Sequence, residues 1–350
     1  MRLTKVYDRM KEENLDALFI KNRNNIRYIT GFTGDAGIFY LDKKQGVLVT
    51  DGRFTEQATQ EIKPLKVLEY KGSIWEELAD LAKDAKRVGF DGNRFNFEEY
   101  AKLCKLMPDK DLVSVDLDEI RIIKEKAELE NLATAAKIAD EAFTKLLPQI
   151  QKGMTEKELA ARLEYYMKNL GSDKTSFDTI VASGPRSALP HAQPTDRVLE
   201  VGDFVTFDFG AMYKGYHSDM TRTVLIGMAR DWHKEIYGIV EEAQRHGVAA
   251  AKVGMMGQEL DALVRKEIAD KGYDKFFIHG TGHGVGLEIH ELPNINKLGT
   301  KPLETNMVFS VEPGIYIPGQ GGVRIEDTVV LTEAGAHPLN SIGRQLIEII

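Results

Sequence analysis

The chain is poor in cysteine and lacks long apolar runs, basic clusters and low-complexity segments. Its single cysteine, Cys104, excludes an intrachain disulfide and is typical of a reducing cytoplasm. We expect Cys104 to be buried, because it lies in an apolar run at residues 100–107 that is predicted to be helical. No stretch approaches the roughly 18 apolar residues of a membrane span, and residues 1–20 lack the apolar core of a secretory leader.

The charge and composition of the chain restrict the class of protein further. The formal net charge is −8 and no run of Lys or Arg is present, whereas binding to a phosphate backbone requires clustered cations. A hydrophobic content of 43% with 29% charged residues is typical of a globular protein. The sequence therefore predicts a cytoplasmic protein that binds neither nucleic acid nor membrane.

The length of 350 residues exceeds that of one ordinary core, so we expect two domains, at residues 1–120 and 121–350. In the first domain, short helices alternate with β-prone runs, which predicts a small α/β domain with a mixed sheet. In the second, two long amphipathic helices at residues 125–147 and 155–170 precede antiparallel hairpins, which predicts an α+β domain. Thr155 opens the second of these helices with a capping-box pattern.

The most informative segment is a predicted β-hairpin centred on a turn at residues 214–215. If its two strands pair symmetrically about that turn, Asp208 lies opposite Thr221, and Asp219 projects from the same face as a diagonal neighbour of Asp208. The two aspartate backbones then lie roughly 7–8 Å apart, which suits a pair of metal ions about 3.5–4 Å apart. Aspartates on the solvated face of a hairpin are the ordinary alternative.

A glycine-rich loop at residues 278–291 carries three histidines, His279, His283 and His290. Its glycines permit close backbone approach to a bound group. The loop is not a dinucleotide fingerprint, because other residues occupy the third glycine position of GxGxxG. It is therefore a candidate for binding a metal ion or an oxyanion. Three other histidines lie among charged or turn residues and are expected at the surface: His233, His246 and His337.

Two glutamates stand at the edges of apolar strands in the last third of the chain. Glu312 follows a β-prone run, and alternation places its neighbour Val311 on the opposite face. Glu326 lies within another such run, where Arg324 shares its face. A glutamate at a strand end is usually only solvated. Two of them, following an aspartate pair and a histidine loop, favour a shared site.

These motifs resemble those of the creatinase/aminopeptidase metallopeptidases with the pita-bread fold, and most nearly those of the Xaa-Pro peptidases, prolidase and aminopeptidase P. The resemblance rests on DFG…GYHSDMTRT, GTGHGVGLEIHE, EPGIY and VRIED, between residues 183 and 327. The first domain is similar to the creatinase-type N-terminal domain through YITGFTG and TDGRF. The implied fold is α+β, with a C-terminal pita-bread domain preceded by a smaller α/β creatinase-like domain.

The resemblance implies two divalent cations held by five side chains. Asp208 would bind one ion, and His283 and Glu312 the other. Asp219 and Glu326 would bridge the two ions. The charges agree, because four carboxylates balance two divalent cations, whereas without cations the carboxylates would repel one another and take up protons. Ligands dominated by carboxylates favour Mn²⁺, with Co²⁺ or Zn²⁺ as alternatives.

The implied reaction is hydrolysis of the peptide bond that precedes a proline. Two cations lower the pKa of a shared water and polarise the scissile carbonyl, and Glu312 accepts the proton as general base. By the same resemblance, His191 and His290 are assigned to the carbonyl oxygen and the tetrahedral intermediate. His279 is expected to line the substrate pocket.

Two further side chains are expected beside the substrate. Arg324 is expected to hold an acidic ligand, and Tyr316 to donate a hydrogen bond at the site. The expected substrates are peptides with proline in second position, either dipeptides or longer chains. Asn294 stands where some prolidases carry an arginine after the HExP segment, so the sequence leaves these two substrate lengths open.

The family resemblance also suggests a homodimer. Two alternative functions remain at this stage. One is an exopeptidase similar to methionine aminopeptidase, which shares the ligand set but normally lacks so large a first domain. The other is a non-catalytic module of the same fold that binds peptides.

Overall fold

The computed structural model describes residues 2–350, and the chain divides into two compact units between Arg121 and Ile122. Within residues 2–350, no helix combines the length and the apolar character needed to cross a bilayer.

The first unit is built on one six-stranded sheet of order β4-β3-β2-β1-β5-β6. Strand β2 pairs antiparallel with β1 and with β3. Strand β4 pairs in parallel with β3, and β5 pairs in parallel with β1 and with β6. The predicted mixed sheet is therefore confirmed. The strands are β1 (Ala17–Ile20), β2 (Ile38–Asp42), β3 (Gly46–Thr50), β4 (Lys66–Glu69), β5 (Arg87–Phe90) and β6 (Asp111–Ser114). The helices are α1 (Arg2–Glu12), α2 (Arg23–Thr30), α3 (Thr55–Glu61), α4 (Ile74–Leu81), α5 (Phe97–Leu106) and the 3₁₀ turn η1 (Asp118–Arg121).

Cys104 is exposed, so its predicted burial is wrong. It does lie in a helix, α5, but that helix buries only a narrow face. Leu103 and the C-cap residue Met107, one turn apart, occupy that face and are 0% and 3% exposed. Cys104 follows Leu103 directly and is therefore rotated by about 100° away from the core.

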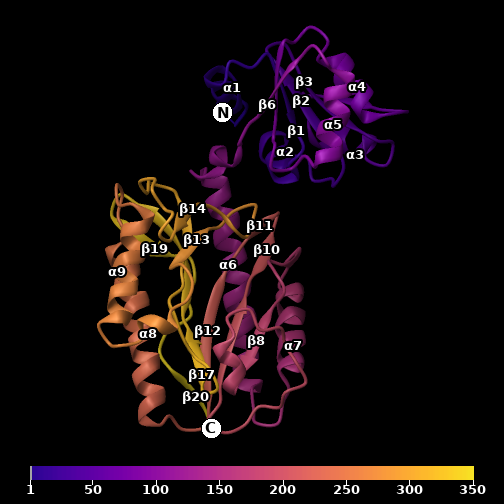
Figure 1. Ribbon diagram of the computed structural model, residues 1–350. Coiled ribbons are helices and arrows are strands. Elements are labelled where there is room, and N and C mark those ends of the chain that lie inside the picture. The colour runs from indigo at the N-terminus through magenta and orange to yellow at the C-terminus, as the bar shows by residue number, and fades with distance from the viewer. Residues whose placement is uncertain (1) are drawn as a thin grey trace. The chain divides into compact units, whose positions relative to one another are not determined.

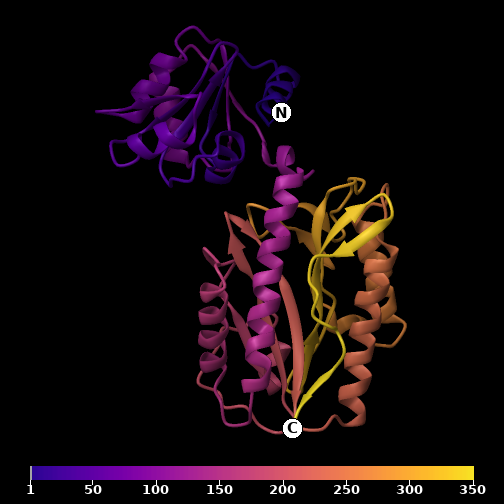
Figure 2. The same ribbon diagram turned by 180° about the vertical axis from the view of Figure 1, so that it is seen from behind.

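The second unit is built on a nine-stranded sheet flanked by four long helices. Figures 1 and 2 show α6 and α7 beside one half of this sheet and α8 and α9 beside the other. The helices are α6 (Lys126–Leu146), α7 (Glu156–Asn169), α8 (Asp231–Ala250) and α9 (Gly257–Ala269), with 3₁₀ turns η2 (Leu147–Gln149), η3 (Gly184–Ala188) and η4 (Asp274–Phe276). The capping box predicted at Thr155 is present, with the Thr155 side chain accepting the Glu158 N–H.

The large sheet has the order β14-β13-β15-β18-β12-β9-β8, with β19 pairing to β18 and β20 to β12. Its strands are β8 (Ile180–Ser183), β9 (Phe204–Phe209), β12 (Met220–Ile226), β13 (Gly282–Gly284), β14 (Glu291–Ile295), β15 (Val308–Val311), β18 (Glu326–Thr332), β19 (Gly335–Pro338) and β20 (Ile347–Ile349). Two small sheets complete the unit, from β7 (Lys174–Thr175), β10 (Ala211–Tyr213) and β11 (Tyr216–His217), and from β16 (Gly314–Ile317) and β17 (Gly321–Arg324).

Apolar residues of the sheet pack against the helices and leave polar residues on the other face. The ring of Phe143 on α6 lies 5.3 Å from that of Phe207 and 5.4 Å from that of Phe209 on β9. Because side chains alternate along a strand, Asp208 between them projects from the opposite face. Phe309 and Val311 of β15 are likewise buried in the core that includes α8 and α9. One face of the sheet is thus free to carry a polar site.

The predicted hairpin forms, with Asp208 opposite Thr221. Its turn has left-handed backbone at Lys214 and Gly215, with φ of 47° and 80°, as hairpin turns of two residues require. The hairpin is split into the pairs β9–β12 and β10–β11. The split falls at Gly210, where any Cβ would collide with the Ser218 carbonyl oxygen. Only glycine permits this close approach of the strands.

His233 is buried, contrary to the expectation that it lies at the surface. Its Nδ1 accepts the Arg230 N–H at 3.0 Å, so Nε2 carries the proton and donates to the Gly202 carbonyl at 3.2 Å. Burial lowers the pKa of this imidazole, which keeps it neutral in the core. His337 is exposed as expected, and His246 is half-buried.

Candidate metal centre

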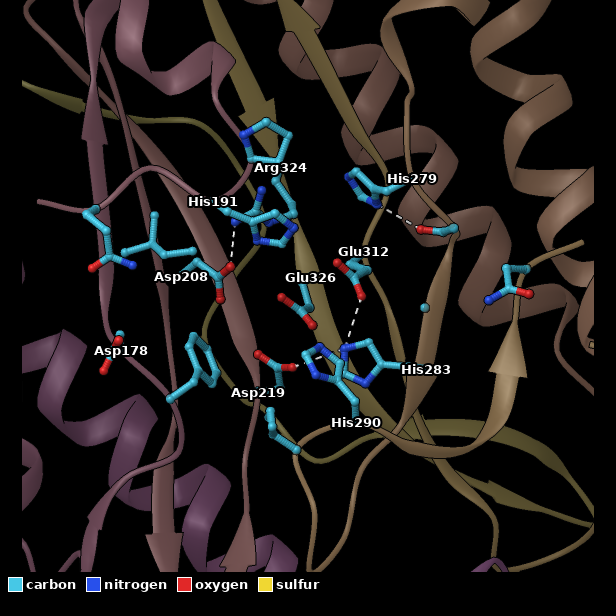
Figure 3. A pocket seen from close by; sticks show the side chains of 18 residues that line it. Asp178, His191, Asp208, Asp219, His279, His283, His290, Glu312, Arg324 and Glu326 are labelled. Atoms are coloured by element: carbon cyan, nitrogen blue, oxygen red, sulfur yellow. Dashed lines mark hydrogen bonds and ion pairs between the residues drawn. The ribbon is translucent and has the colours of Figure 1, made fainter. Parts of the chain in front are cut away.

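Five consecutive neighbouring strands of the large sheet bring together the five side chains predicted to bind metal. Across the sheet, His283 lies in β13, Glu312 directly follows β15, and Glu326 begins β18. Asp219 directly precedes β12, and Asp208 lies in β9. Figure 3 shows their polar groups facing a common space, with Glu326 between Asp208 and Glu312. Four segments far apart in the sequence thus form one cluster.

The ligand atoms of this cluster lie close enough to share a cation. The Nε2 atom of His283 is 3.5 Å from Asp219 Oδ2 and 3.3 Å from Glu312 Oε1. One ligand atom from each of Asp219, His283 and Glu326 lies within 4.8 Å of the other two. Separations of this size match donors that surround one ion about 2.0–2.3 Å from each of them.

The electrostatics of the carboxylates also fit bound cations. Asp219 and Glu326 are 5% and 2% exposed. Burial raises the pKa of each well above its usual range, and repulsion from neighbouring carboxylates raises it further. Burial likewise raises the pKa of Glu312. Among the described residues, Glu326 Oε1 and Asp208 Oδ1 are buried and find no hydrogen-bond partner. Buried oxygens of this kind are typical of sites completed by a cation.

His283 is oriented as a neutral metal ligand. Its Nδ1 lies 3.1 Å from the carbonyl oxygen of Gly284, which can only accept a hydrogen bond, so Nδ1 carries the proton. The lone pair of Nε2 is therefore free and points toward Asp219 and Glu312. Burial lowers the pKa of the imidazole, which keeps it in this ligating form at neutral pH.

Arg324 and Thr221 hold the carboxylates of Asp208 and Glu326 in place through hydrogen bonds. Arg324 is 3% exposed, and its Nη2 donates to Asp208 Oδ2 at 2.5 Å. Its Nε donates to the Thr221 hydroxyl at 3.1 Å, and that hydroxyl donates to Glu326 Oε2 at 2.7 Å. Sequence reasoning missed Thr221, although it lies two residues after Asp219 and so shares its face of the strand.

A hydrogen-bonded chain runs from Arg324 to the rim of the site. Arg324 Nη1 donates to the Tyr316 hydroxyl oxygen at 2.8 Å, and that hydroxyl donates to His279 Nε2 at 2.8 Å. The Nδ1 of His279 in turn donates to the Gly280 carbonyl at 2.8 Å. Burial lowers the pKa of His279. Tyr316 is 3% exposed and absent from the described residues that line the cavity, so it supports His279 from behind.

The site opens into a cavity of about 460 Å³. Nine of the predicted residues line it, drawn together in Figure 3: Asp208, Asp219, His283, Glu312, Glu326, His191, His279, His290 and Arg324. Seven further side chains, which the sequence analysis did not predict, also line the cavity: Phe177, Asp178, Ile180, Pro190, Gln193, Ile289 and Asn296. Several of these come from the segment 177–193, which has no recognisable motif.

His290 stands beside the cluster with its ring centroid 4.2 Å from that of His283, at an angle of 66°. Desolvation, together with the neighbouring His283 and His191, lowers the pKa of His290 to about 4. At neutral pH this ring is therefore uncharged, with one N–H available to donate a hydrogen bond.

The buried carboxylates and one imidazole on this sheet form the donor set of a metal-dependent hydrolase. The model of metallopeptidase family M24 matches residues 130–333, and that of the Creatinase/Prolidase N-terminal domain matches residues 2–123. The chain belongs to metallopeptidase family M24. The fold expected from the motifs, a creatinase-type domain followed in the sequence by a pita-bread catalytic domain, is confirmed.

Relatives of known name match over almost the whole chain. The chain is 45% identical to the uncharacterized peptidase YqhT of Bacillus subtilis and 41% identical to the Xaa-Pro dipeptidase of Pyrococcus furiosus, each over 99% of both chains. Among solved structures, it is similar to the Xaa-Pro dipeptidase from Bacillus anthracis, with a TM-score of 0.96 and 41% identity over 99% of both chains. It is also similar to the X-Pro aminopeptidase from Thermotoga maritima, with a TM-score of 0.92 and 39% identity over 99% of both chains.

Proposed function

We propose that this metallopeptidase hydrolyses the peptide bond between an N-terminal residue and a following proline. The observation that carries the proposal is the cluster of four carboxylates and one neutral imidazole at the floor of the cavity. The proline preference is supported by relatives named Xaa-Pro dipeptidase and X-Pro aminopeptidase, which match the chain from end to end.

The cluster is proposed to hold two divalent cations, with Mn²⁺ favoured over Co²⁺ and Zn²⁺ because most of its ligands are carboxylates. In this proposal Asp208 contributes to one ion, His283 and Glu312 to the other, and the remaining two carboxylates to both. When bound, such ions lower the pKa of water toward neutrality and polarise a carbonyl group.

Glu312 is proposed as the general base that removes a proton from the attacking water. Its Oε1 accepts the Ser310 hydroxyl at 3.0 Å, which fixes the carboxylate, and its backbone N–H donates to the Thr281 carbonyl at 2.8 Å. Burial raises the pKa of Glu312, which makes its carboxylate a stronger base.

Two histidines of the cavity are proposed to stabilise the oxygen of the scissile carbonyl as negative charge develops on it. His290 is neutral at pH 7 and offers one N–H, and His191 lines the same cavity. Donors aimed at a developing oxyanion in a site shielded from water contribute strongly to catalysis. His279, fixed by the Tyr316 hydroxyl, is proposed to contact the substrate on the opposite wall.

The apolar part of the wall is proposed to bind the pyrrolidine ring. A bond to proline has no N–H for a peptidase to bind, so the ring must be recognised by shape and apolar contact. Four apolar residues line the cavity for this purpose: Phe177, Ile180, Pro190 and Ile289. The sequence alone did not identify these residues.

Residues after the proline are proposed to lie in a second cavity of about 900 Å³. It shares His279, Gly280 and Asn296 with the first cavity, and in this proposal a longer peptide crosses that shared rim. Lys297 lines this second cavity, where its ammonium group can attract the C-terminal carboxylate of a peptide. On this basis the enzyme accepts longer peptides as well as dipeptides.

The enzyme is further proposed to be cytoplasmic and homodimeric. The single cysteine supports a reducing compartment. The homodimer rests on the family resemblance.

The proposal is tested with Mn²⁺-loaded enzyme on Ala-Pro and Ala-Pro-Ala, with Ala-Ala and Met-Ala-Ser as controls. Hydrolysis of the proline peptides alone is expected, and it should stop when EDTA removes the metal. Cleavage of Met-Ala-Ser alone would instead indicate a methionine aminopeptidase. A protein that binds the proline peptides without cleaving them would be a binding module.

A further inference from the structure

A buried ion pair that the proposed reaction does not use lies next to the histidine loop. The Nζ atom of Lys124 is 2.5 Å from Glu291 Oε1, and the two side chains are only 1% and 2% exposed. Lys124 stands just before α6, where its backbone N–H donates to the Asn306 carbonyl at 3.0 Å. It is not among the described residues that line either cavity.

Glu291 follows His290 directly and begins β14, and its carboxylate contacts the loop that presents His290. Its Oε2 accepts the Glu288 N–H at 3.3 Å. Any Cβ at Gly286 would collide with the same carboxylate, so the loop backbone closes tightly around it. The Gly286 N–H donates to the Glu288 carbonyl at 3.0 Å, and the Gly286 carbonyl accepts the His217 N–H at 2.9 Å. The position of the Glu291 carboxylate therefore sets the shape of this loop.

We propose that Lys124 is a positioning residue that acts on His290 through Glu291. The ammonium group on one side and the Glu288 N–H on the other fix both oxygens of the carboxylate, which fixes the loop and the ring at its end. A buried ion pair contributes little net stability compared with an apolar pair, but it restricts geometry. The proposal rests on the proposed role of His290 at the scissile carbonyl.

The competing explanation is that the pair only stabilises the fold. Breaking a buried pair leaves one uncompensated charge and destabilises strongly, whereas replacing both partners by apolar residues is often neutral. We therefore compare Lys124→Met, Glu291→Met and the double variant K124M/E291M. Each single variant is expected to lower the Tm by roughly 10 °C, and the double variant to recover most of that loss.

Activity separates the two explanations. If Lys124 positions His290, kcat on Ala-Pro falls roughly 100-fold in all three variants, as for a catalytic group displaced by about 1 Å. KM is expected to change little, because neither residue lines the cavity. A double variant in which kcat returns together with the Tm would overturn the proposal, since the pair would then act only on stability.

A double-mutant cycle tests whether the effect passes through His290. In the His290→Ala background, Lys124→Met is expected to lower kcat no further, because the group that it positions is absent. Losses that multiply in K124M/H290A would contradict the proposal while leaving the role of His290 intact. A fully active H290A would instead overturn the role of His290 in the proposed function, and with it the role of Lys124.

Discussion

The hydroxyl of Thr221 offers the sharpest test of how the carboxylates are held. It donates to Glu326 Oε2 at 2.7 Å and accepts from Arg324 Nε at 3.1 Å, in a residue that is 0% exposed. Thr221→Val keeps the shape of the side chain but removes the donor. We expect this variant to bind metal more weakly without a change in the fold.

The magnitude follows from the kind of hydrogen bond that is lost. A hydrogen bond to a charged group contributes about 1.5–3 kcal/mol, and each 1.4 kcal/mol corresponds to about tenfold in an equilibrium constant. The Kd for Mn²⁺ is therefore expected to rise roughly 10- to 100-fold, as is usual when the partner of a metal ligand is removed. Isothermal titration calorimetry of metal-free protein measures this directly.

A matched control lies on the neighbouring strand. Thr206 is buried on the same face of the sheet, and its hydroxyl is 3.1 Å from that of Thr223, without contact to a carboxylate. Thr206→Val therefore removes a buried hydroxyl of the same kind and is expected to leave the Kd for Mn²⁺ unchanged. If both variants shift the Kd equally, or neither does, the proposed support of Glu326 by Thr221 is wrong.

Three further outcomes are expected. First, the raised pKa values of Asp219, Glu312 and Glu326 mean that the folded, metal-free protein binds more protons than the unfolded chain above about pH 4. These groups therefore stabilise the protein in acid and lose that contribution as pH rises toward neutrality. Urea unfolding in EDTA at pH 5 and pH 7 should show a smaller decrease for Asp219→Asn than for the wild type, and equal decreases would refute the assignment. Second, Glu312→Gln is expected to lower kcat on Ala-Pro roughly 10²- to 10⁴-fold at saturating metal; a loss below tenfold excludes it as the general base. Third, Ala262→Trp, at an exposed position of the second cavity, should raise the KM for Ala-Pro-Ala-Ala roughly tenfold but not that for Ala-Pro. The exposed Ala161→Trp on α7 is the control, and an equal effect of both variants would argue against this cavity as a substrate site.

Local pattern was sufficient to predict much of the site. The period of two along a strand placed Asp208 opposite Thr221 and on the face that Asp219 shares, and the structure has that pairing. The same period put Arg324 and Glu326 on one face, and both line the cavity. These are relations between residues close in sequence, which strand geometry fixes without knowledge of the tertiary fold.

Relations between distant segments were not accessible in the same way. The strand β18 lies between β15 and β12, so Glu326 pairs with Thr221 across more than a hundred residues of sequence. No turn links these two strands, and their register depends on the whole sheet. The pairing of Lys124 with Glu291 and the wall formed by residues 177–193 have the same origin.

Two predictions failed because composition does not determine burial. Cys104 lies in a helix that turns only a narrow face, marked by Leu103 and the following Met107, toward the core. Cys104 lies outside that face and is therefore exposed. His233 lies among charged residues, yet both of its ring nitrogens find backbone partners in the interior. A polar side chain can be buried when its hydrogen bonds are satisfied, and a sequence does not show those partners.

Metal stoichiometry tests the central claim most directly. Protein stripped with EDTA, reloaded with Mn²⁺ and freed of excess ion should contain about two manganese atoms per chain by mass spectrometry, the number expected for a site with paired ions. The same measurement on Asp219→Asn should give fewer. Wild-type protein that is folded by circular dichroism yet retains no manganese would contradict the account.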